Sequence, residues 1–368
     1  MSSEEFSFTD HSHRRLNPLT QSWVLCSPHR AKRPWLGQVE ESSSEQRPEY
    51  DPKCYLCPGN TRATGARNEQ YESTFVFTND YAAVHADQPE CSDAALKQVA
   101  GSHASGELFR VESTRGQCKV VCFSPRHDLT LPELSIGDIS KVVRTWQQVY
   151  AELSADPAIG YVQLFENKGA MMGCSNPHPH GQVWALSDVP SEPAKEMASL
   201  HAFQQKHRHG ACLLCSYVEA EQKNANAEST NRVVLENDSF MALVPFWAVW
   251  PFETMIVAKA HVADVGGLSS KQVHDLAETM QGLTIRYDNM FECSFPYSMG
   301  LHQSPTAAHP DSACCHLHLH FYPPLLRSAT VRKFLVGFEM MAEPQRDLTA
   351  EQAASRLRAL SPIHYKKS

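Results

Sequence analysis

The stretch Gly173-Cys174-Ser175-Asn176-Pro177-His178-Pro179-His180-Gly181-Gln182 places two imidazoles two residues apart, behind small residues and ahead of an amide. Strand-like residues at 160–167 and 183–186 flank it, so an extended backbone would place His178 and His180 on one face. A neutral imidazole attacks phosphorus near neutral pH, and the resulting phosphoramidate is labile enough to pass the group on. We therefore interpret the stretch as a phosphoryl or nucleotidyl transfer site, with one histidine as nucleophile and the other as its support.

The residues around the two histidines suit a phosphate ligand. Gly173, Ser175 and Gly181 let the backbone approach a phosphate closely. The amide of Gln182 can donate hydrogen bonds to non-bridging oxygens without adding charge. The alternative is a pair of ordinary histidines beside a proline turn, and the strand pattern on both sides argues against it.

A second histidine cluster, His316-Leu317-His318-Leu319-His320, alternates with leucine, so an extended backbone would place three imidazoles on one face. Each cluster follows a C-x-x-C pair, strand patterns, a further histidine and a helical pattern, in the same order. The same number of residues separates Cys57 from Asn79 and Cys215 from Asn237. This order predicts a duplicated α+β unit, each copy an antiparallel sheet with a helix packed on it.

Several other segments complete the predicted outline. We interpret 187–200, which contains Pro190 and Pro193, as the connection between the halves, and 88–106 and 219–231 as loops. Thr349 followed by Gln352 forms a capping-box pattern, which predicts a final helix running to about Leu360.

The first C-x-x-C pair, Cys54 and Cys57, matches the ligands that zinc prefers when histidines from distant strands complete the set. His127 and His178 are the best candidates to complete it. A disulfide or two free thiols is the alternative, but twelve cysteines without a secretory leader indicate a reducing compartment, where metal binding is favoured.

The second pair, Cys212 and Cys215, is open to two interpretations. It is either a vestige of the duplication or a metal site completed by His261 and His316. The residue pattern alone does not decide between them.

Composition limits the class of partner. The 368 residues include 33 Lys and Arg against 41 Asp and Glu, which gives a net charge of -8 and argues against nucleic acid. No apolar run approaches the roughly 20 residues of a membrane span. The first residues also lack the pattern of a signal peptide, so a soluble cytoplasmic protein is expected.

Taken together, the chain resembles the galactose-1-phosphate uridylyltransferase family of the histidine triad superfamily. Apart from 173–182, the resemblance rests on the segments 30–35, 165–169, 295–300, 322–327 and 332–339. It implies two tandem histidine-triad-like units, residues 1–190 with the nucleophile and a Cys/His zinc site and 191–368 with a second metal site and a sugar-contacting segment. It also implies a homodimer with active sites at the subunit interface.

The resemblance further implies double-displacement transfer of UMP from UDP-glucose to galactose 1-phosphate through a uridylyl-His180 intermediate, with Gln182 holding the phosphoryl oxygens. Positions near the nucleotide sugar fall on Arg30, Arg33, Asn79, Asp80, Asn167, Gly173, Cys174 and Ser175. Positions that contact the sugar from the partner subunit fall on Lys333, Phe334, Val336, Phe338, Glu339 and Gln345.

Two metal sites are implied by the same resemblance. The zinc ligands fall on Cys54, Cys57, His127 and His178, the four residues that spacing had favoured. A second site, for zinc or Fe²⁺, falls on Glu196, His302, His318 and His320 rather than on the second cysteine pair. One carboxylate and three imidazoles form a closed ligand set, which favours a structural role.

Two alternatives compete with this interpretation. One is a nucleotide phosphorylase or hydrolase of the same superfamily, in which phosphate or water receives the nucleotidyl group. Gln182 and the segment 333–345 argue against it, because the rival more often has histidine at the position of Gln182. The other is a non-catalytic, zinc-stabilised binding module, which has no need of Gln182 or of the small residues ahead of His178.

Overall fold

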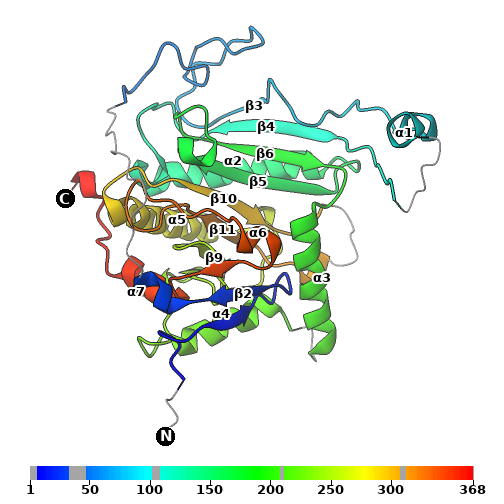
Figure 1. The fold of residues 1–368 in the computed structure, drawn as a ribbon. Helices are drawn as coiled ribbons and strands as arrows, with labels where there is room; N and C mark the ends of the chain where they lie inside the picture. Colours follow the sequence, from blue (N-terminus) through cyan, green and yellow to red (C-terminus); the bar gives the residue numbers. More distant parts are fainter. Residues whose placement is uncertain (1–5, 33–46, 102–107, 208–210, 307–311, 368) are drawn as a thin grey trace, which may run out of the picture.

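The structure is a computed structural model that describes residues 6–32, 47–101, 108–207, 211–306 and 312–367. Its main element is a nine-stranded antiparallel sheet with the strand order β3-β4-β6-β5-β10-β11-β9-β8-β7 (Figure 1). The strands are β3 (Phe75–Thr78), β4 (Gly116–Cys122), β5 (Tyr161–Lys168), β6 (His180–Leu186), β7 (Val233–Glu236), β8 (Phe240–Leu243), β9 (Thr254–Ala258), β10 (Tyr297–His302) and β11 (His318–Tyr322).

The strand order confirms the predicted α+β fold and its duplication. The order β4-β6-β5 in the first half is repeated as β9-β11-β10 in the second. The halves join where β5 pairs antiparallel with β10, with Asn167 opposite Ser298. The outer strands differ, because β3 pairs directly with β4 whereas β8 lies between β7 and β9.

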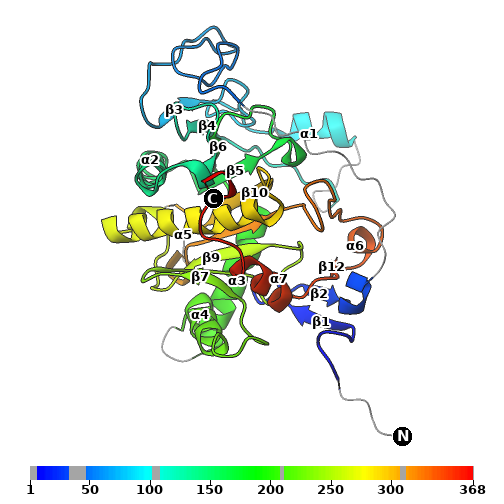
Figure 2. The ribbon, with the colours of Figure 1, turned by 90° about the vertical axis from the view of Figure 1, so that its left-hand side faces the viewer.

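One long helix from each half packs on the same face of the sheet. The helices are α2 (Ile136–Ser154) and α5 (Ser270–Phe291), close to the predicted helical patterns. Ser135 and Ser269 cap them by accepting hydrogen bonds from the backbone N–H groups of Asp138 and Gln272. Figure 2 shows both helices on one side of the sheet, where their apolar residues share a core with strand residues such as Leu164 and Val183.

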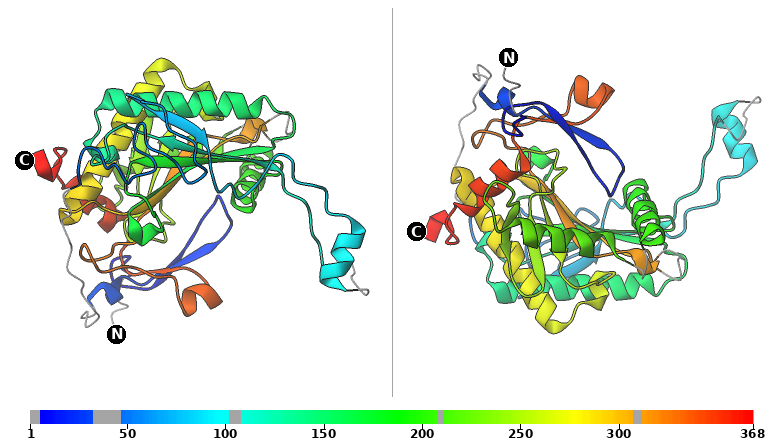
Figure 3. Two further views of the ribbon diagram at one scale, coloured as in Figure 1. Left: turned by 90° about the horizontal axis from the view of Figure 1, so that it is seen from above. Right: turned by 90° about the horizontal axis from the view of Figure 1, so that it is seen from below.

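A smaller sheet lies on the opposite side of the molecule (Figures 2 and 3). It contains β1 (His13–Leu16), β2 (Trp23–Cys26) and β12 (Gln345–Arg346), so the N-terminal hairpin pairs with a strand from near the C-terminus. The short helix α6 (Phe338–Met341) lies beside it. The small sheet therefore combines residues from both ends of the chain.

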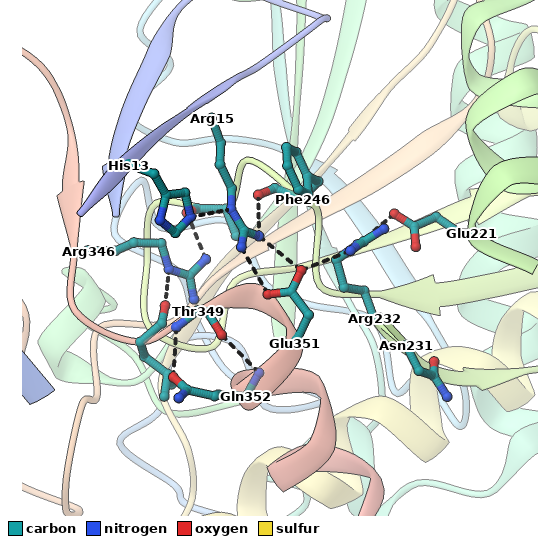
Figure 4. Close-up of polar contacts among 12 residues, drawn as sticks. His13, Arg15, Glu221, Asn231, Arg232, Phe246, Arg346, Thr349, Glu351 and Gln352 are labelled. Carbon is teal, nitrogen blue, oxygen red and sulfur yellow. Dashed lines mark hydrogen bonds and ion pairs between the residues drawn. The ribbon is translucent and has the colours of Figure 1, made fainter. Parts of the chain in front are cut away.

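A buried network of charges fastens the hairpin to the main body (Figure 4). Both guanidinium Nη atoms of Arg15 donate to the carboxylate of Glu351, at 3.0 and 3.1 Å. Arg232 donates to the same carboxylate at 2.8 Å and to Glu221 at 2.9 Å. Because cations and carboxylates alternate along Arg15, Glu351, Arg232 and Glu221, each of these four charges has a partner of opposite sign.

Two sequence-based interpretations were wrong, and a third was incomplete. The segment 187–200, expected to connect the halves, lies between β6 and α4, but it contains the start of a helix, α3 (Ser191–Lys206). Proline is tolerated there because the first turn of a helix needs no backbone donors. The expected loops 88–106 and 219–231 contain α1 (Asp93–Ala100) and the end of α4 (Leu213–Asn224).

The predicted final helix is confirmed as α7 (Ala350–Arg358), including the capping box of Thr349 and Gln352. It ends two residues before Leu360. Among the helices of the described residues, none is both long enough and apolar enough to cross a membrane.

Candidate active site and metal centres

The two strands at the centre of the first half bring the predicted transfer residues to one open face. Along β6, His180 and Gln182 are half-buried and alternate with Gly181 and Val183, which are buried. The helix α2 covers the face that contains Val183, so His180 and Gln182 face the other side of the sheet.

The imidazole of His180 is held in one tautomer. Its Nδ1 lies 2.7 Å from the carbonyl oxygen of His178, which can only accept, so Nδ1 carries the proton. Burial lowers the pKa of His180, although the hydrogen bond to His178 acts in the opposite direction. The ring therefore presents a neutral Nε2 with a lone pair, as an attack on phosphorus requires.

Position 181, between His180 and Gln182, has room only for glycine. A Cβ atom built on Gly181 would lie 2.9 Å from both the ring of Phe123 and the carbonyl oxygen of Phe165. The backbone oxygen cannot move without disturbing the pairing of β5 with β6. Gly181 thus allows β6 to pack closely between its neighbours, which fixes the positions of His180 and Gln182.

Gln182 and Asn167 lie on neighbouring strands beside His180. The side-chain oxygen of Gln182 accepts a hydrogen bond from Trp184 Nε1 at 3.2 Å, which leaves the amide NH₂ as its donor end. Asn167 on β5 accepts a hydrogen bond from the hydroxyl of Ser298 at 2.6 Å. Two amide side chains are therefore held in place by residues of the sheet.

The small residues ahead of His178 and His180 form a turn that leads into β6. Gly173 has a left-handed backbone, with φ of 77°, which favours glycine. Ser175 is exposed, and the thiol of half-buried Cys174 donates to the carbonyl of Asn176 at 3.0 Å. The turn leads directly into His178 and His180.

The first cysteine pair forms the predicted four-ligand cluster. Cys54, Cys57, His127 and His178 are all buried, and their ligand atoms all lie within 4.8 Å of one another. The Sγ atom of Cys57 is 3.6 Å from Nδ1 of both histidines. A tetrahedral zinc, with Zn–S of about 2.3 Å and Zn–N of about 2.0 Å, requires an S···N distance of roughly 3.5 Å, so the cluster fits this ion.

Residues that the sequence analysis did not single out support this cluster. The carbonyl of Ser124 lies 2.9 Å from His178 Nε2, which places the proton there and leaves Nδ1 for a metal. The amide of buried Asn176 donates to Cys54 Sγ at 3.4 Å and accepts from the backbone N–H of His178 at 3.0 Å. The only sequence signal for Asn176 was its place within the decisive stretch.

A second cluster joins strands β10 and β11 to α3. The carboxylate of Glu196 lies 2.7 Å from His302 Nδ1, 3.3 Å from His318 Nε2 and 3.5 Å from His320 Nε2. The Nε2 atoms of His318 and His320 are buried without a hydrogen-bond partner, as expected of atoms that ligate a metal. Although burial alone would raise it, the surrounding histidines hold the pKa of Glu196 well below its usual value, so the carboxylate is ionised.

The register of the sheet relates the two sites. Gln182 lies opposite Phe165, Phe165 opposite Gly300, and Gly300 opposite His320. Paired residues of antiparallel strands lie on the same face, so the Glu196 cluster occupies, in the second half, the place of the transfer site in the first. A third cluster, formed by Cys212, Cys215, His261 and His316, is also present, although the resemblance had moved the second metal site away from it.

The predicted nucleotide positions outside the sheet have partners within the chain. The carboxylate of Asp80 lies 3.5 Å from Arg62 Nη1 and accepts from Thr64 at 3.1 Å. Asn79 precedes it and caps the next turn by accepting from the backbone N–H of Tyr81. Arg33 lies outside the described residues.

Asp347, which the sequence analysis did not identify, brings together two predicted residues from opposite ends of the chain. Its Oδ1 lies 3.4 Å from Arg30 Nε and 2.7 Å from Gln345 Nε2. Arg30 is half-exposed, whereas Gln345 is buried in β12. The pairing of β12 with β2 accounts for this meeting of distant segments.

The remaining predicted sugar contacts lie on the segment that carries α6. Lys333 Nζ and Glu339 Oε1 form an ion pair at 2.5 Å with little solvent exposure. Phe334, Val336 and Phe338 are exposed. The segment lies with the small sheet and away from α2 and α5 (Figure 2).

Comparison with known proteins agrees with this geometry. Two family models match the chain: Galactose-1-phosphate uridyl transferase, N-terminal domain, over residues 4–190, and the C-terminal domain of the same name over residues 196–368. Proteins named galactose-1-phosphate uridylyltransferase are similar to it over almost their full length. Those of Kluyveromyces lactis and Saccharomyces cerevisiae are 53% and 52% identical, with 98% and 99% of this chain and 96% and 99% of the relatives covered.

A bacterial relative of the same name, from Haemophilus influenzae, is 51% identical over 98% of both chains. Among solved structures, a uridylyltransferase has a TM-score of 0.70 and 25% identity, with 95% of this chain and 98% of that chain covered. An ADP-glucose phosphorylase from Arabidopsis thaliana has a TM-score of 0.71 at 23% identity, covering 96% and 99%, and this likeness concerns the fold alone.

Proposed function

The chain belongs to the galactose-1-phosphate uridylyltransferase family, and from that premise we propose that His180 accepts the uridylyl group of UDP-glucose and passes it to galactose 1-phosphate. The enzyme is a nucleotidyltransferase with the UDP-glucose:hexose-1-phosphate uridylyltransferase activity of its relatives. The observation that carries the residue assignment is the hydrogen bond from His180 Nδ1 to the carbonyl of His178, at 2.7 Å. It leaves Nε2 as the nucleophilic atom on the open face.

The reaction consists of two displacements at one phosphorus atom. Nε2 of His180 attacks the α-phosphorus of UDP-glucose, an N–P bond forms, and the bond to the oxygen of glucose 1-phosphate breaks. A phosphate oxygen of galactose 1-phosphate then attacks the same phosphorus, the N–P bond breaks, and UDP-galactose leaves. No proton needs to leave Nδ1, because a neutral imidazole begins and ends the cycle.

Gln182 is proposed to hold the non-bridging oxygens of the transferred phosphoryl group. Its oxygen is occupied by Trp184 Nε1, so its NH₂ group is directed to ligands rather than to the protein. Donors that are held in place before the reaction stabilise charge that develops in the transition state. Asn167, Gly173, Cys174 and Ser175 are proposed to line the same nucleotide-sugar site.

Replacing Gln182 by Asn should slow formation or discharge of the intermediate by about 10²–10³-fold, because a side chain one methylene shorter misplaces the donors. Single-turnover measurement of each half-reaction would show the loss. Gln182→Glu keeps the length but removes the donors, so it should be impaired at least as much. An unchanged rate in Gln182→Asn would remove Gln182 from the mechanism.

The metals are proposed to be zinc at Cys54, Cys57, His127 and His178, and zinc or Fe²⁺ at Glu196, His302, His318 and His320. Both ligand sets are closed, so each ion would hold protein segments in position rather than bind substrate. In the first site His178 has two tasks. Its ring is directed towards the cysteines, while its carbonyl fixes the tautomer of His180.

Further assignments rest on the family and on positions in the fold. Arg30, Arg33, Asn79 and Asp80 are proposed to lie near the uridine and phosphates, and Lys333, Phe334, Val336, Phe338, Glu339 and Gln345 near the sugar. The division into residues 1–190 and 191–368 is proposed as the boundary of the two histidine-triad-like units. A reducing compartment, the cytoplasm, is proposed because all twelve cysteines are free thiols.

We also propose a homodimer in which the segment 333–345 reaches the active site of the partner subunit. Its support is an exposed apolar surface around α6, formed by Phe334, Val336, Phe338, Met340 and Met341. Met340 and Met341 are 70% and 85% exposed, more than a single chain in water would favour for adjacent apolar side chains.

The dimer proposal predicts that Met341→Asp shifts the protein from dimer to monomer, because a charge would be buried at the interface. Light scattering after size-exclusion chromatography measures the mass. Leu108→Asp is the matched control, since Leu108 is 77% exposed on the segment near α1 and should leave the dimer intact. A monomeric wild-type protein, or a dimeric Met341→Asp variant, would contradict the proposed interface.

An assay with different acceptors separates the proposed function from its alternatives. Protein incubated with UDP-glucose and galactose 1-phosphate should give UDP-galactose and glucose 1-phosphate. A phosphorylase would instead give its nucleotide product with inorganic phosphate as acceptor, and a hydrolase would do so with water alone. A zinc-stabilised binding module would give no product with any acceptor.

A further inference from the structure

The third cluster, at the second cysteine pair, is used neither by the proposed reaction nor by the two metal sites described above. It consists of Cys212, Cys215, His261 and His316, whose ligand atoms all lie within 4.8 Å of one another. The cysteines lie at the start of α4, His261 follows β9, and His316 precedes β11. Three segments distant in sequence therefore bring soft and imidazole ligands to one point.

The distances within this cluster suit a tetrahedral ion. Cys212 Sγ and Cys215 Sγ lie 3.2 and 3.5 Å from His316 Nδ1. Cys215 Sγ is 4.0 Å from His261 Nδ1. These values bracket the S···N distance of roughly 3.5 Å that a four-coordinate zinc requires, and both thiols are free rather than joined in a disulfide.

The surroundings of His316 repeat those of His178 in the first half. The Nε2 atom of His316 lies 2.8 Å from the carbonyl oxygen of Ala258, as that of His178 lies 2.9 Å from the carbonyl of Ser124. Each carbonyl lies at or just after the end of the equivalent strand, β9 or β4. In both rings the proton is therefore placed on Nε2, and Nδ1 is left to ligate a metal.

In both halves a backbone N–H group donates a hydrogen bond to the sulfur of the first cysteine of the pair. The backbone N–H of Leu56 donates to Cys54 Sγ at 3.4 Å, and that of Cys215 donates to Cys212 Sγ at 3.5 Å. A backbone donor directed at sulfur stabilises a thiolate, the form that binds metal. A redox-active pair would need no histidines beside it, whereas here both histidines direct Nδ1 at the sulfur atoms.

We propose that Cys212, Cys215, His261 and His316 form a third metal site, which binds a structural zinc ion. The ion would hold the start of α4 next to the end of β9 and the start of β11. Four protein ligands complete the coordination, so no position is left for a substrate.

This site would also position a ligand of the neighbouring metal cluster. The carbonyl oxygen of His316 lies 2.7 Å from His318 Nδ1, which leaves His318 Nε2 to face Glu196. The same relation links His178 to His180 in the first half. In each half, the cysteine cluster thus fixes a histidine whose carbonyl orients the imidazole two residues further on.

Metal analysis of the purified holoprotein tests the proposal. The double variant Cys212→Ser/Cys215→Ser should contain one zinc ion fewer per chain than the wild-type protein, as measured by plasma mass spectrometry. It should keep the ions of the other two clusters. Cys91→Ser is the matched control, because Cys91 is an exposed free thiol outside every cluster, and its metal content should be unchanged.

Equal metal content in the double variant and the control would overturn the proposal, as would a Cys212–Cys215 disulfide in protein purified without reductant. If the double variant fails to fold, His261→Ala decides the question. His261 is the exposed ligand, so its removal leaves the core intact. One zinc ion per chain should then pass to a chelator faster than from the wild-type protein, and equal release rates would overturn the proposal.

Discussion

Replacing His180 by Gly is expected to lower the rate of uridylyl transfer by roughly 10⁴-fold or more, while the protein stays folded and keeps its metals. The loss is large because both displacements pass through the same nitrogen atom. The retained metal follows from the geometry, since His180 belongs to none of the three ligand sets. Steady-state assay and metal analysis of the same preparation measure both effects.

His178→Ala is the matched comparison, because His178 is also a histidine and lies only two residues before His180. This variant should lose the zinc of the first cluster and part of its activity, since it removes a ligand but keeps the nucleophile. If His180→Gly lost metal and His178→Ala kept it, the division of tasks between the two histidines would be the reverse of the one proposed.

Replacing Lys168 by Met is expected to lower the free energy of unfolding by about 3–5 kcal/mol, the largest stability effect that we predict. Lys168 Nζ lies 2.8 Å from Asp288 Oδ1, and both side chains are almost completely buried. The pair ties the end of β5, next to Asn167, to the last turns of α5. Removing the cation leaves a carboxylate buried without its main partner of opposite charge.

Urea unfolding followed by circular dichroism measures this change. The matched control is Lys141→Met, because Lys141 and Asp138 form an ion pair of the same length, 2.8 Å, at the exposed surface of α2. Its loss should cost less than about 1 kcal/mol, since water screens exposed charges. A Lys168→Met variant as stable as this control would show that the buried pair contributes no net stability.

The parts of the fold that follow a local period could be predicted from the sequence. Apolar residues spaced at helical intervals identified α2 and α5, and alternation in 316–320 placed His318 and His320 on one face of β11. His316, expected on the same face, lies before the strand and belongs to another cluster. Repetition of these patterns then led to the duplicated fold. Local periodicity carries this information because burial of one face imposes it directly on the chain.

The helix α3 could not be recognised in this way. Its first turn contains Pro193, which looks like a break, and its apolar residues do not form a clear stripe. Glu196 is buried on this helix because it meets three histidines from distant strands. A contact of this kind depends on tertiary packing, and only the family resemblance identified the residue beforehand.

The second cysteine pair shows that the family resemblance and the residue pattern can each indicate a different cluster, both of which the structure contains. Reasoning from the residues left Cys212 and Cys215 as a possible metal site with His261 and His316, and the resemblance moved the second site to the Glu196 cluster. The structure contains both groups, and His316 of one and His318 of the other are two residues apart at the start of β11. Residues such as Asn176 and Asp347, which position others through hydrogen bonds, had no sequence signal strong enough to identify them.

The central claim, a covalent intermediate on His180, is tested most directly by trapping it. The pure protein is incubated with UDP-glucose labelled in the uridylyl phosphate, and the mass and acid lability of any adduct are measured. The account predicts one acid-labile uridylyl group on His180, which galactose 1-phosphate discharges. Absence of an adduct from folded, metal-loaded protein, or an adduct that persists in His180→Gly, would contradict it.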